Sequence, residues 1–265
     1  MSKPSEPNVD DLRVPRRVTI ELGAAVVPVD DVSLDYAVSW TVYKHRDDWE
    51  VLVTPNLHHL RVVRGAPSAA EPYSAAGLSL ADGWPVAWLA SRVAGRRVDR
   101  VIGAELFQKV IEQTVTKKPL VLIGGTPSPG LEALFHRCRN RGWSVSSEPA
   151  PRSELVDPTS RAALVSRVAR AGSGGIVVIG VGAPLQESIA CEIAKMPGSG
   201  AILCLGMSIN FSSGVARRAP RIVQSFRLEW AYRALQEPRR LFKRYAQDLL
   251  ALPHFIRANP RPPRK

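Results

Sequence analysis

Polar side chains stand directly after several apolar runs that we expect to be buried strands. Thr54 and Asn56 follow one run, Asp82 follows the next, and Gln186 and Glu187 come shortly after a third. A single carboxylate at a strand exit can act as a general base, while hydroxyl and amide groups can orient a polar ligand. Each signal is weak alone, because an Asp before a Gly is also a common turn or cap residue.

A glycine-rich turn follows a fourth apolar run, in the segment VLIGGTPSPG. Gly124 and Gly125 stand before a predicted helix whose free N–H groups could hold a phosphate. Such turns also occur in α/β proteins that bind no phosphate. Only the coincidence of several exits at one sheet edge indicates a nucleotide site.

Several competing motifs are missing from the sequence. Gly180 and Gly182 lack the third glycine of a nicotinamide fingerprint, and neither a P-loop nor a G-x-S-x-G elbow occurs. His58 and His59 have no acidic or Cys partner at metal-ligand spacing. No D-x-D occurs either, which removes the usual carboxylate pair for a metal-bound diphosphate. We therefore expect no metal site and no cofactor.

The elements that must position these residues alternate between strand and helix. Predicted strands lie at 18–22, 50–54, 78–81, 120–123, 176–181 and 201–205. Predicted helices lie near 31–45, 84–95, 104–117, 128–141, 158–171 and 185–195. Short, continuous Val/Ile/Leu runs are typical of strands covered on both faces. The pattern predicts an α/β fold with a doubly wound, mainly parallel Rossmann-like sheet, in which ligands bind beyond the carboxyl ends of the strands.

Most of the excess charge of this 265-residue chain lies near its C-terminus. Residues 215–265 hold thirteen Lys or Arg against three acidic residues, so they carry +10 of the formal +12. We divide the chain into a core at 13–214 and a basic helical appendage at 215–256. Tails at 1–12 and 257–265 are expected to be disordered.

The appendage reads as two basic amphipathic helices separated at Pro238. Ile222, Phe226, Trp230 and Ala234 recur at helical spacing, and a second stripe follows the break: Leu241, Phe242, Tyr245, Leu249 and Leu250. Such helices favour an anionic membrane surface. The alternatives are helices that simply pack on the core with a solvated basic face, and nucleic acid, which we do not expect as a partner.

Blocks of residues in a fixed order connect these features to a known family. The blocks are T-P-N (54–56), A-D-G-W-P-V-A-W (81–88), R-V-I-G-A-E-L-F (100–107), L-I-G-G (122–125), G-A-P-L-Q-E (182–187), G-V-A-R-R-A-P (214–220) and R-L-E-W-A-Y-R-x-x-x-E-P-R-R (227–240). Together they resemble the WecG/TagA/CpsF glycosyltransferases over roughly residues 18–250.

The resemblance implies an inverting, metal-independent transferase with a UDP-sugar donor and a polyprenyl-diphosphate-linked saccharide acceptor. Asp82 matches the family's proposed base, and Thr54, Asn56, Arg100 and Gln186 match pocket residues. Gly124, Gly125, Glu187 and Arg233 are further candidates for substrate binding, with Arg100 and Arg233 placed to neutralise the leaving diphosphate. Basic candidates for contact with membrane or diphosphate are Arg217, Arg218, Arg227, Arg239, Arg240, Lys243 and Arg244.

Departures from the family pattern bear on the donor sugar. Asn210 replaces a usual Asp, His58 a usual Glu, Leu185 a usual Lys and Glu105 a usual Asp, and residues 144–157 lack a G-Y-F motif. These departures favour a neutral or acidic hexose for exopolysaccharide or capsule over N-acetylmannosamine. A UDP-N-acetylmannosamine transferase of the teichoic acid or common antigen type stays open as the alternative.

The expected location is the cytoplasmic side of the cell membrane, with peripheral attachment. No run of eighteen apolar residues occurs, the first twenty residues resemble no signal peptide, and the three cysteines suit a reducing compartment. A homo-oligomer stays open as a partner arrangement. Two other classes stay open as well: a non-catalytic sugar-nucleotide-binding scaffold, which would bind donor without turnover, and a nicotinamide-dependent sugar-nucleotide enzyme.

Overall fold

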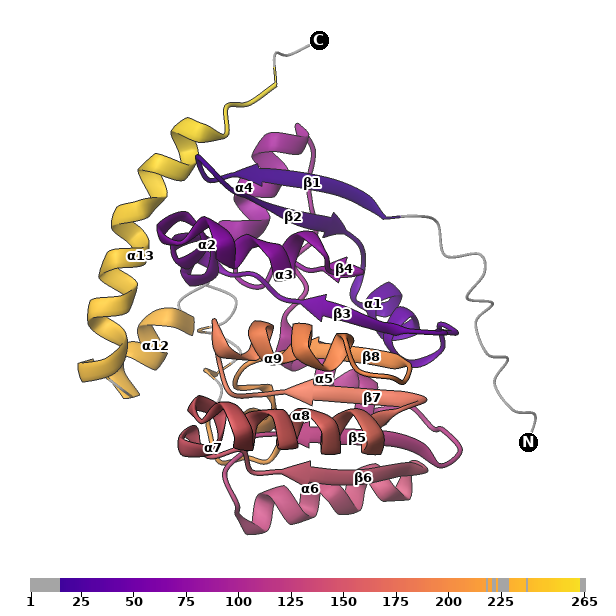
Figure 1. The fold of residues 1–265 in the computed structure, drawn as a ribbon. Coiled ribbons are helices and arrows are strands. Elements are labelled where there is room, and N and C mark those ends of the chain that lie inside the picture. Colours follow the sequence, from indigo (N-terminus) through magenta and orange to yellow (C-terminus); the bar gives the residue numbers. More distant parts are fainter. Residues whose placement is uncertain (1–14, 218, 221–222, 224–228, 237, 263–265) are drawn as a thin grey trace.

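A six-stranded parallel sheet forms the centre of the molecule (Figure 1). The computed structural model describes residues 15–217, 219–220, 223, 229–236 and 238–262. The sheet has the order β4-β3-β8-β7-β5-β6, and every pairing in it is parallel. Its strands are β3 (Trp49–Val53), β4 (Leu78–Ser79), β5 (Lys118–Ile123), β6 (Trp143–Glu148), β7 (Gly175–Ile179) and β8 (Gly200–Cys204). The predicted Rossmann-like α/β fold is confirmed.

Helices cover both faces of this sheet. One face packs against α1 (Leu34–Val42), α5 (Gly103–Glu112) and α6 (Pro129–Asn140), and the other against α8 (Pro158–Gly172) and α9 (Leu185–Ala194). Alternate residues of each strand enter the two cores: in β5, Leu120 and Leu122 enter one, and Val121 and Ile123 the other. This double coverage explains why β5, β7 and β8 read as continuous apolar runs.

The strand predicted at 18–22 does not belong to the parallel sheet. It forms β1 (Arg16–Glu21), which pairs antiparallel with β2 (Val26–Asp31) in a separate two-stranded sheet. The sequence pattern does not predict β2, because Pro28 and two Asp residues interrupt its apolar residues. Asp30 holds this ribbon on the core, since its buried carboxylate accepts bonds from Arg17 and from the Ser79 N–H of β4.

Further helices complete the described part of the core. They are α2 (Leu57–Gly65), η2 (Pro67–Ala70), α3 (Glu71–Ser74), α4 (Trp84–Ala94), α7 (Arg152–Val156) and α10 (Ser208–Ser212). Of these, α4 alone was predicted. The sequence pattern does not predict strand β6 either, because its sequence WSVSSE contains no apolar run. Strand β6 lies at the edge of the sheet and pairs on one side only, where Ser residues are tolerated.

The appendage contains α12 (Glu229–Gln236) and α13 (Pro238–Ala258), which lie along one side of the core (Figure 1). Proline is favourable at the first helical position, so Pro238 starts α13 rather than interrupting it. Contacts between α13 and α2 fix its position. The predicted stripe is divided: Leu241 is buried, whereas Phe242 and Leu250 are 72% and 80% exposed.

The first residues of the C-terminal tail predicted at 257–265 are ordered against the core. Helix α13 continues to Ala258, and Asn259 is buried. The Asn259 side chain accepts from the Glu21 N–H at 2.8 Å and donates to the Glu21 carbonyl at 2.8 Å. The Asn259 amide thus bonds both backbone groups of one edge-strand residue. The composition of the tail does not predict this ordered contact. The tail predicted at 1–12 lies outside the described residues.

Candidate active site

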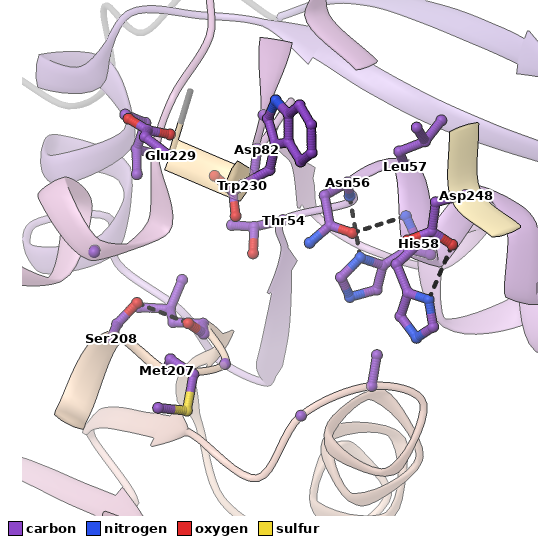
Figure 2. A pocket seen from close by; sticks show the side chains of 18 of the residues that line it. Thr54, Asn56, Leu57, His58, Asp82, Met207, Ser208, Glu229, Trp230 and Asp248 are labelled. Carbon is purple, nitrogen blue, oxygen red and sulfur yellow. Dashed lines mark hydrogen bonds and ion pairs between the residues drawn. The ribbon is translucent and has the colours of Figure 1, made fainter. Parts of the chain in front are cut away.

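A cavity of about 510 Å³ opens beyond the carboxyl ends of the parallel strands. The loops after β3, β4, β7 and β8 form one wall, and residues of α12 and α13 form the other (Figure 2). The volume lies within the range of small-molecule sites, and the position is where doubly wound sheets bind ligands. Of the predicted residues, Thr54, Asn56, Asp82, Gln186, Arg217 and Arg244 line it.

The loop after β3 presents one hydrogen-bond acceptor and one donor to the cavity. The Thr54 hydroxyl donates to the Cys204 carbonyl at 2.9 Å, so its lone pairs are left for a ligand. The Asn56 side-chain oxygen accepts from the His58 N–H at 3.0 Å and caps α2. Its amide nitrogen is therefore the group that can bind a ligand.

Asp82 is held beside this loop by backbone hydrogen bonds. Its N–H donates to the Pro55 carbonyl at 3.0 Å, and the Leu80 N–H donates to the Val53 carbonyl at 2.9 Å. Gly83 follows with φ of 92°, a conformation that suits glycine and lets the chain turn into α4. The half-buried Asp82 carboxylate faces the cavity near Thr54 and Asn56 (Figure 2).

Gln186 and Glu187, at the start of α9, have different places. Gln186 lines the cavity, and its side-chain oxygen accepts from the Gly206 N–H at 3.0 Å. Glu187 lies behind the wall, 2% exposed, with its Oε1 3.4 Å from His59 Nε2. Burial alone would raise the pKa of Glu187, but the nearby His59 side chain and the hydrogen bond from Gln186 outweigh it and lower that pKa. Because Glu187 is buried behind the wall, this geometry places it away from direct contact with a substrate.

Arg100 is close to the cavity but does not line it. Its guanidinium lies 3.7 Å from the Glu229 carboxylate, and Glu229 does line the cavity. Figure 2 shows Glu229 and Trp230 entering from the appendage side. A carboxylate of the protein thus stands beside the cation that we assigned to the diphosphate.

Gly124 and Gly125 are not brought to the cavity. The Gly124 N–H donates to the Glu148 carbonyl, and the Thr126 N–H donates to the Asn210 side chain at 2.9 Å. A Cβ on Gly125 would meet Ile209 at 2.8 Å. Close packing of this turn accounts for its glycines.

The basic candidates of the appendage separate into two groups. Arg217 and Arg244 line the cavity, and the Arg244 guanidinium lies 5.0 Å from the centre of the Tyr245 ring. Arg239 and Lys243 are exposed on α13. Arg218 and Arg227 lie outside the described residues, as do the side chains of Arg233 and Arg240.

Asp248 joins the appendage to the core at the rim of the cavity. Its carboxylate accepts from Arg61 Nε at 2.6 Å and lies 3.3 Å from His58 Nδ1 (Figure 2). Burial would raise the pKa of Asp248, but these two partners outweigh it and lower that pKa. This contact was not predicted, although a lone acidic residue within a basic helix was a signal for it.

Two features of the described residues bear on metal binding and on membranes. Among them, no group of three or more His, Cys, Asp or Glu side chains is arranged to hold a metal ion. No described helix is both long and apolar enough to cross a bilayer.

A family comparison covers most of the chain. Residues 24–264 match the model of the Glycosyl transferase WecG/TagA/CpsF family. The chain belongs to this family. Membership makes it a glycosyltransferase and implies a nucleotide-sugar donor and a glycan acceptor, consistent with cell-surface glycan synthesis. The match includes α12 and α13, so the appendage belongs to the family domain.

Proposed function

We propose that this WecG/TagA/CpsF glycosyltransferase is an inverting, metal-independent hexosyltransferase. Its donor would be a UDP-hexose and its acceptor a polyprenyl-diphosphate-linked saccharide for exopolysaccharide or capsule. The observation that carries the proposal is the placement of Asp82 beside Thr54 and Asn56 in a cavity between the sheet edge and the appendage.

In this proposal, Asp82 accepts the proton of the acceptor hydroxyl while that oxygen attacks the anomeric carbon from the face opposite the diphosphate. The new glycosidic bond forms as the bond from the anomeric carbon to the diphosphate oxygen breaks, and UDP leaves with that electron pair. One carboxylate is sufficient for inversion, because no covalent intermediate is needed.

Among the described residues, two other carboxylates line the cavity, and their surroundings suit other tasks. Asp248 is engaged by Arg61 and His58, and Glu229 stands 3.7 Å from Arg100. Both belong to the appendage, whereas Asp82 is fixed to the core through Pro55. A base must be held accurately relative to the attacked carbon, which favours Asp82.

Arginine would neutralise the departing diphosphate. Arg217 and Arg244 line the cavity, and Arg100 lies 3.7 Å from Glu229, which also lines it. Guanidinium groups bind phosphate oxygens in a bidentate manner, which stabilises charge that develops on the leaving group.

A membrane-facing role for α13 is supported by its outer side. Phe242 and Leu250 are exposed there, next to the exposed cations Arg239 and Lys243. This combination suits an interfacial helix on anionic lipid. We propose peripheral attachment at the cytoplasmic face of the cell membrane, where a lipid-linked acceptor would be presented.

The preference for a hexose rests mainly on His58. All four substituted family positions are among the described residues, and His58 lines the cavity whereas Glu105, Leu185 and Asn210 do not. A change from a family Glu to an imidazole alters the charge next to Asn56. The N-acetylmannosamine alternative is decided by assay.

The test is release of UDP from a panel of UDP-sugars by the full-length protein, with a synthetic polyprenyl-diphosphate acceptor. We expect turnover with a UDP-hexose, slower turnover with UDP-N-acetylmannosamine, and persistence in excess EDTA. Turnover restored by Mg²⁺ or Mn²⁺ after loss in EDTA would contradict the arginine-based account. Donor binding without turnover on any acceptor would favour a scaffold.

A further inference from the structure

We propose that His59 is a positioning residue that clamps the Asn56 backbone, and that buried Glu187 selects the imidazole tautomer that makes the clamp. Neither residue touches the proposed reacting atoms. The inference rests on the proposed function in one respect, namely that Asn56 binds substrate.

The clamp is a reciprocal pair of hydrogen bonds at the start of α2. The Asn56 N–H donates to His59 Nδ1 at 3.1 Å, while the Asn56 side-chain oxygen accepts from the His58 N–H at 3.0 Å. In the usual capping box, Glu or Gln at this third helical position accepts the N-cap N–H. Here an imidazole takes that place. The two bonds fix the residue whose amide nitrogen faces the cavity.

The clamp requires one tautomer of His59. Because Nδ1 accepts a hydrogen bond, the proton of the neutral ring must be on Nε2. Nε2 lies 3.4 Å from Glu187 Oε1, and both side chains are buried. The pair lies outside hydrogen-bond geometry, but the negative charge of the carboxylate attracts an N–H and repels a ring lone pair, so it favours the ring with Nε2 protonated. The hydrogen bond that Gln186 Nε2 donates to Glu187 Oε1 at 2.7 Å stabilises the ionised form of that carboxylate.

The same carboxylate also orients Gln186. Gln186 Nε2 donates to Glu187 Oε1 at 2.7 Å, which directs the Gln186 oxygen to the Gly206 N–H. Glu187 thereby connects the loops that follow β3, β7 and β8, all of which line the cavity. Loss of its charge should disturb several loops of the sheet-edge wall at once.

The experiment compares three variants of the full-length protein. His59→Leu removes the acceptor and should lower kcat/KM about 10–100-fold, the usual effect of losing a residue that orients a site. His59→Gln supplies the acceptor of an ordinary capping box and should restore most of that loss. Glu187→Gln keeps the shape but not the charge, and should fall between the two.

A spectroscopic measurement decides the tautomer without any substrate. Imidazole ¹⁵N spectra should show His59 protonated on Nε2 in the native protein and a mixture of tautomers in Glu187→Gln. A proton on Nδ1 in the native protein would overturn the clamp, even if the His59→Leu variant did not fold. So would equal impairment of folded His59→Leu and His59→Gln proteins, or full activity of His59→Leu.

The two proposals fail in different ways. If Asn56→Ala transfers sugar normally, the substrate role of Asn56 is wrong, and the ¹⁵N result still decides the clamp. If Asn56→Ala is impaired but His59→Leu is not, the clamp is wrong and the proposed function stands.

Discussion

The two walls of the cavity are built in different ways. The sheet-edge wall is held by backbone bonds between neighbouring loops: Asp82 N–H to Pro55, and Leu205 N–H to Ile179 at 3.1 Å. The appendage wall is one helix pair, attached to the core by side chains such as Asp248 and Phe255.

The two walls therefore suit different tasks. Groups that must be placed accurately, such as Asp82, sit where parallel strands fix the backbone. Groups that we propose to meet a large or charged ligand, such as Arg244 and Trp230, lie on a part that a few side-chain contacts hold. Changes in the sheet-edge wall should therefore affect chemistry, and changes in the appendage should affect docking and binding.

The largest effect is expected at Asp82. Asp82→Asn removes the proposed base but keeps its size, so kcat should fall by about 10²–10⁴-fold with nearly unchanged UDP affinity. Asp47→Asn, at a side chain that is 93% exposed on the core, is the matched control. Near-normal turnover in a folded Asp82→Asn protein would remove this residue from the mechanism.

Loosening the appendage should have a smaller effect, which should appear in docking rather than in chemistry. Phe255 is fully buried, and Phe255→Ala should cost about 3–5 kcal/mol of the free energy that docks α13. Amide exchange across 238–258 should accelerate while β5 and β7 stay protected. Phe242→Ala, at an exposed position of the same helix, should leave exchange unchanged. Simultaneous acceleration in the central strands would show that the appendage and core unfold as one unit.

The Asp248 contact should make appendage docking sensitive to acid. The folded-state pKa of Asp248 is below its ordinary 3.8, so its ion pairs stabilise docking fully above that value and are lost as pH falls through the lower folded pKa. Asp248→Asn should weaken docking by about 1–3 kcal/mol at neutral pH and flatten this acid dependence. Exchange of α13 measured against pH checks it, and an unchanged acid profile in the variant would contradict the assignment.

The smallest effect on transfer to a soluble acceptor is expected from the outer side of α13. Phe242→Ser with Leu250→Ser should leave that transfer unchanged but reduce sedimentation with anionic vesicles several-fold. Val156→Ser, at a residue of the core that is 62% exposed, is the control. Unchanged vesicle binding by the double variant would assign the membrane surface elsewhere.

The sequence was informative where burial follows local pattern. Strands β5, β7 and β8 are buried on both faces, so their apolar runs identified them. Strand β6 is polar because it lies at an edge, and β2 contains Pro28, so neither pattern indicated a strand.

The site was predictable to the extent that it depends on strand exits. Thr54, Asn56, Asp82 and Gln186 all reach the cavity for that reason. Gly124 and Gly125, at another strand exit, do not line the cavity. Their turn packs closely against Val181 and Ile209. Contacts between distant segments, such as Arg61 with Asp248 across 187 residues, leave no local pattern that a sequence reading can use.

Amide exchange of the full-length protein with and without UDP tests the central claim most directly. If the donor binds between the sheet edge and the appendage, UDP should slow exchange in both walls, at 54–59 and 205–208 in the core and at 229–249 in the appendage. Protection confined to the Gly124–Gly125 turn and the start of α6, with no change at 54–59, would contradict the assigned site.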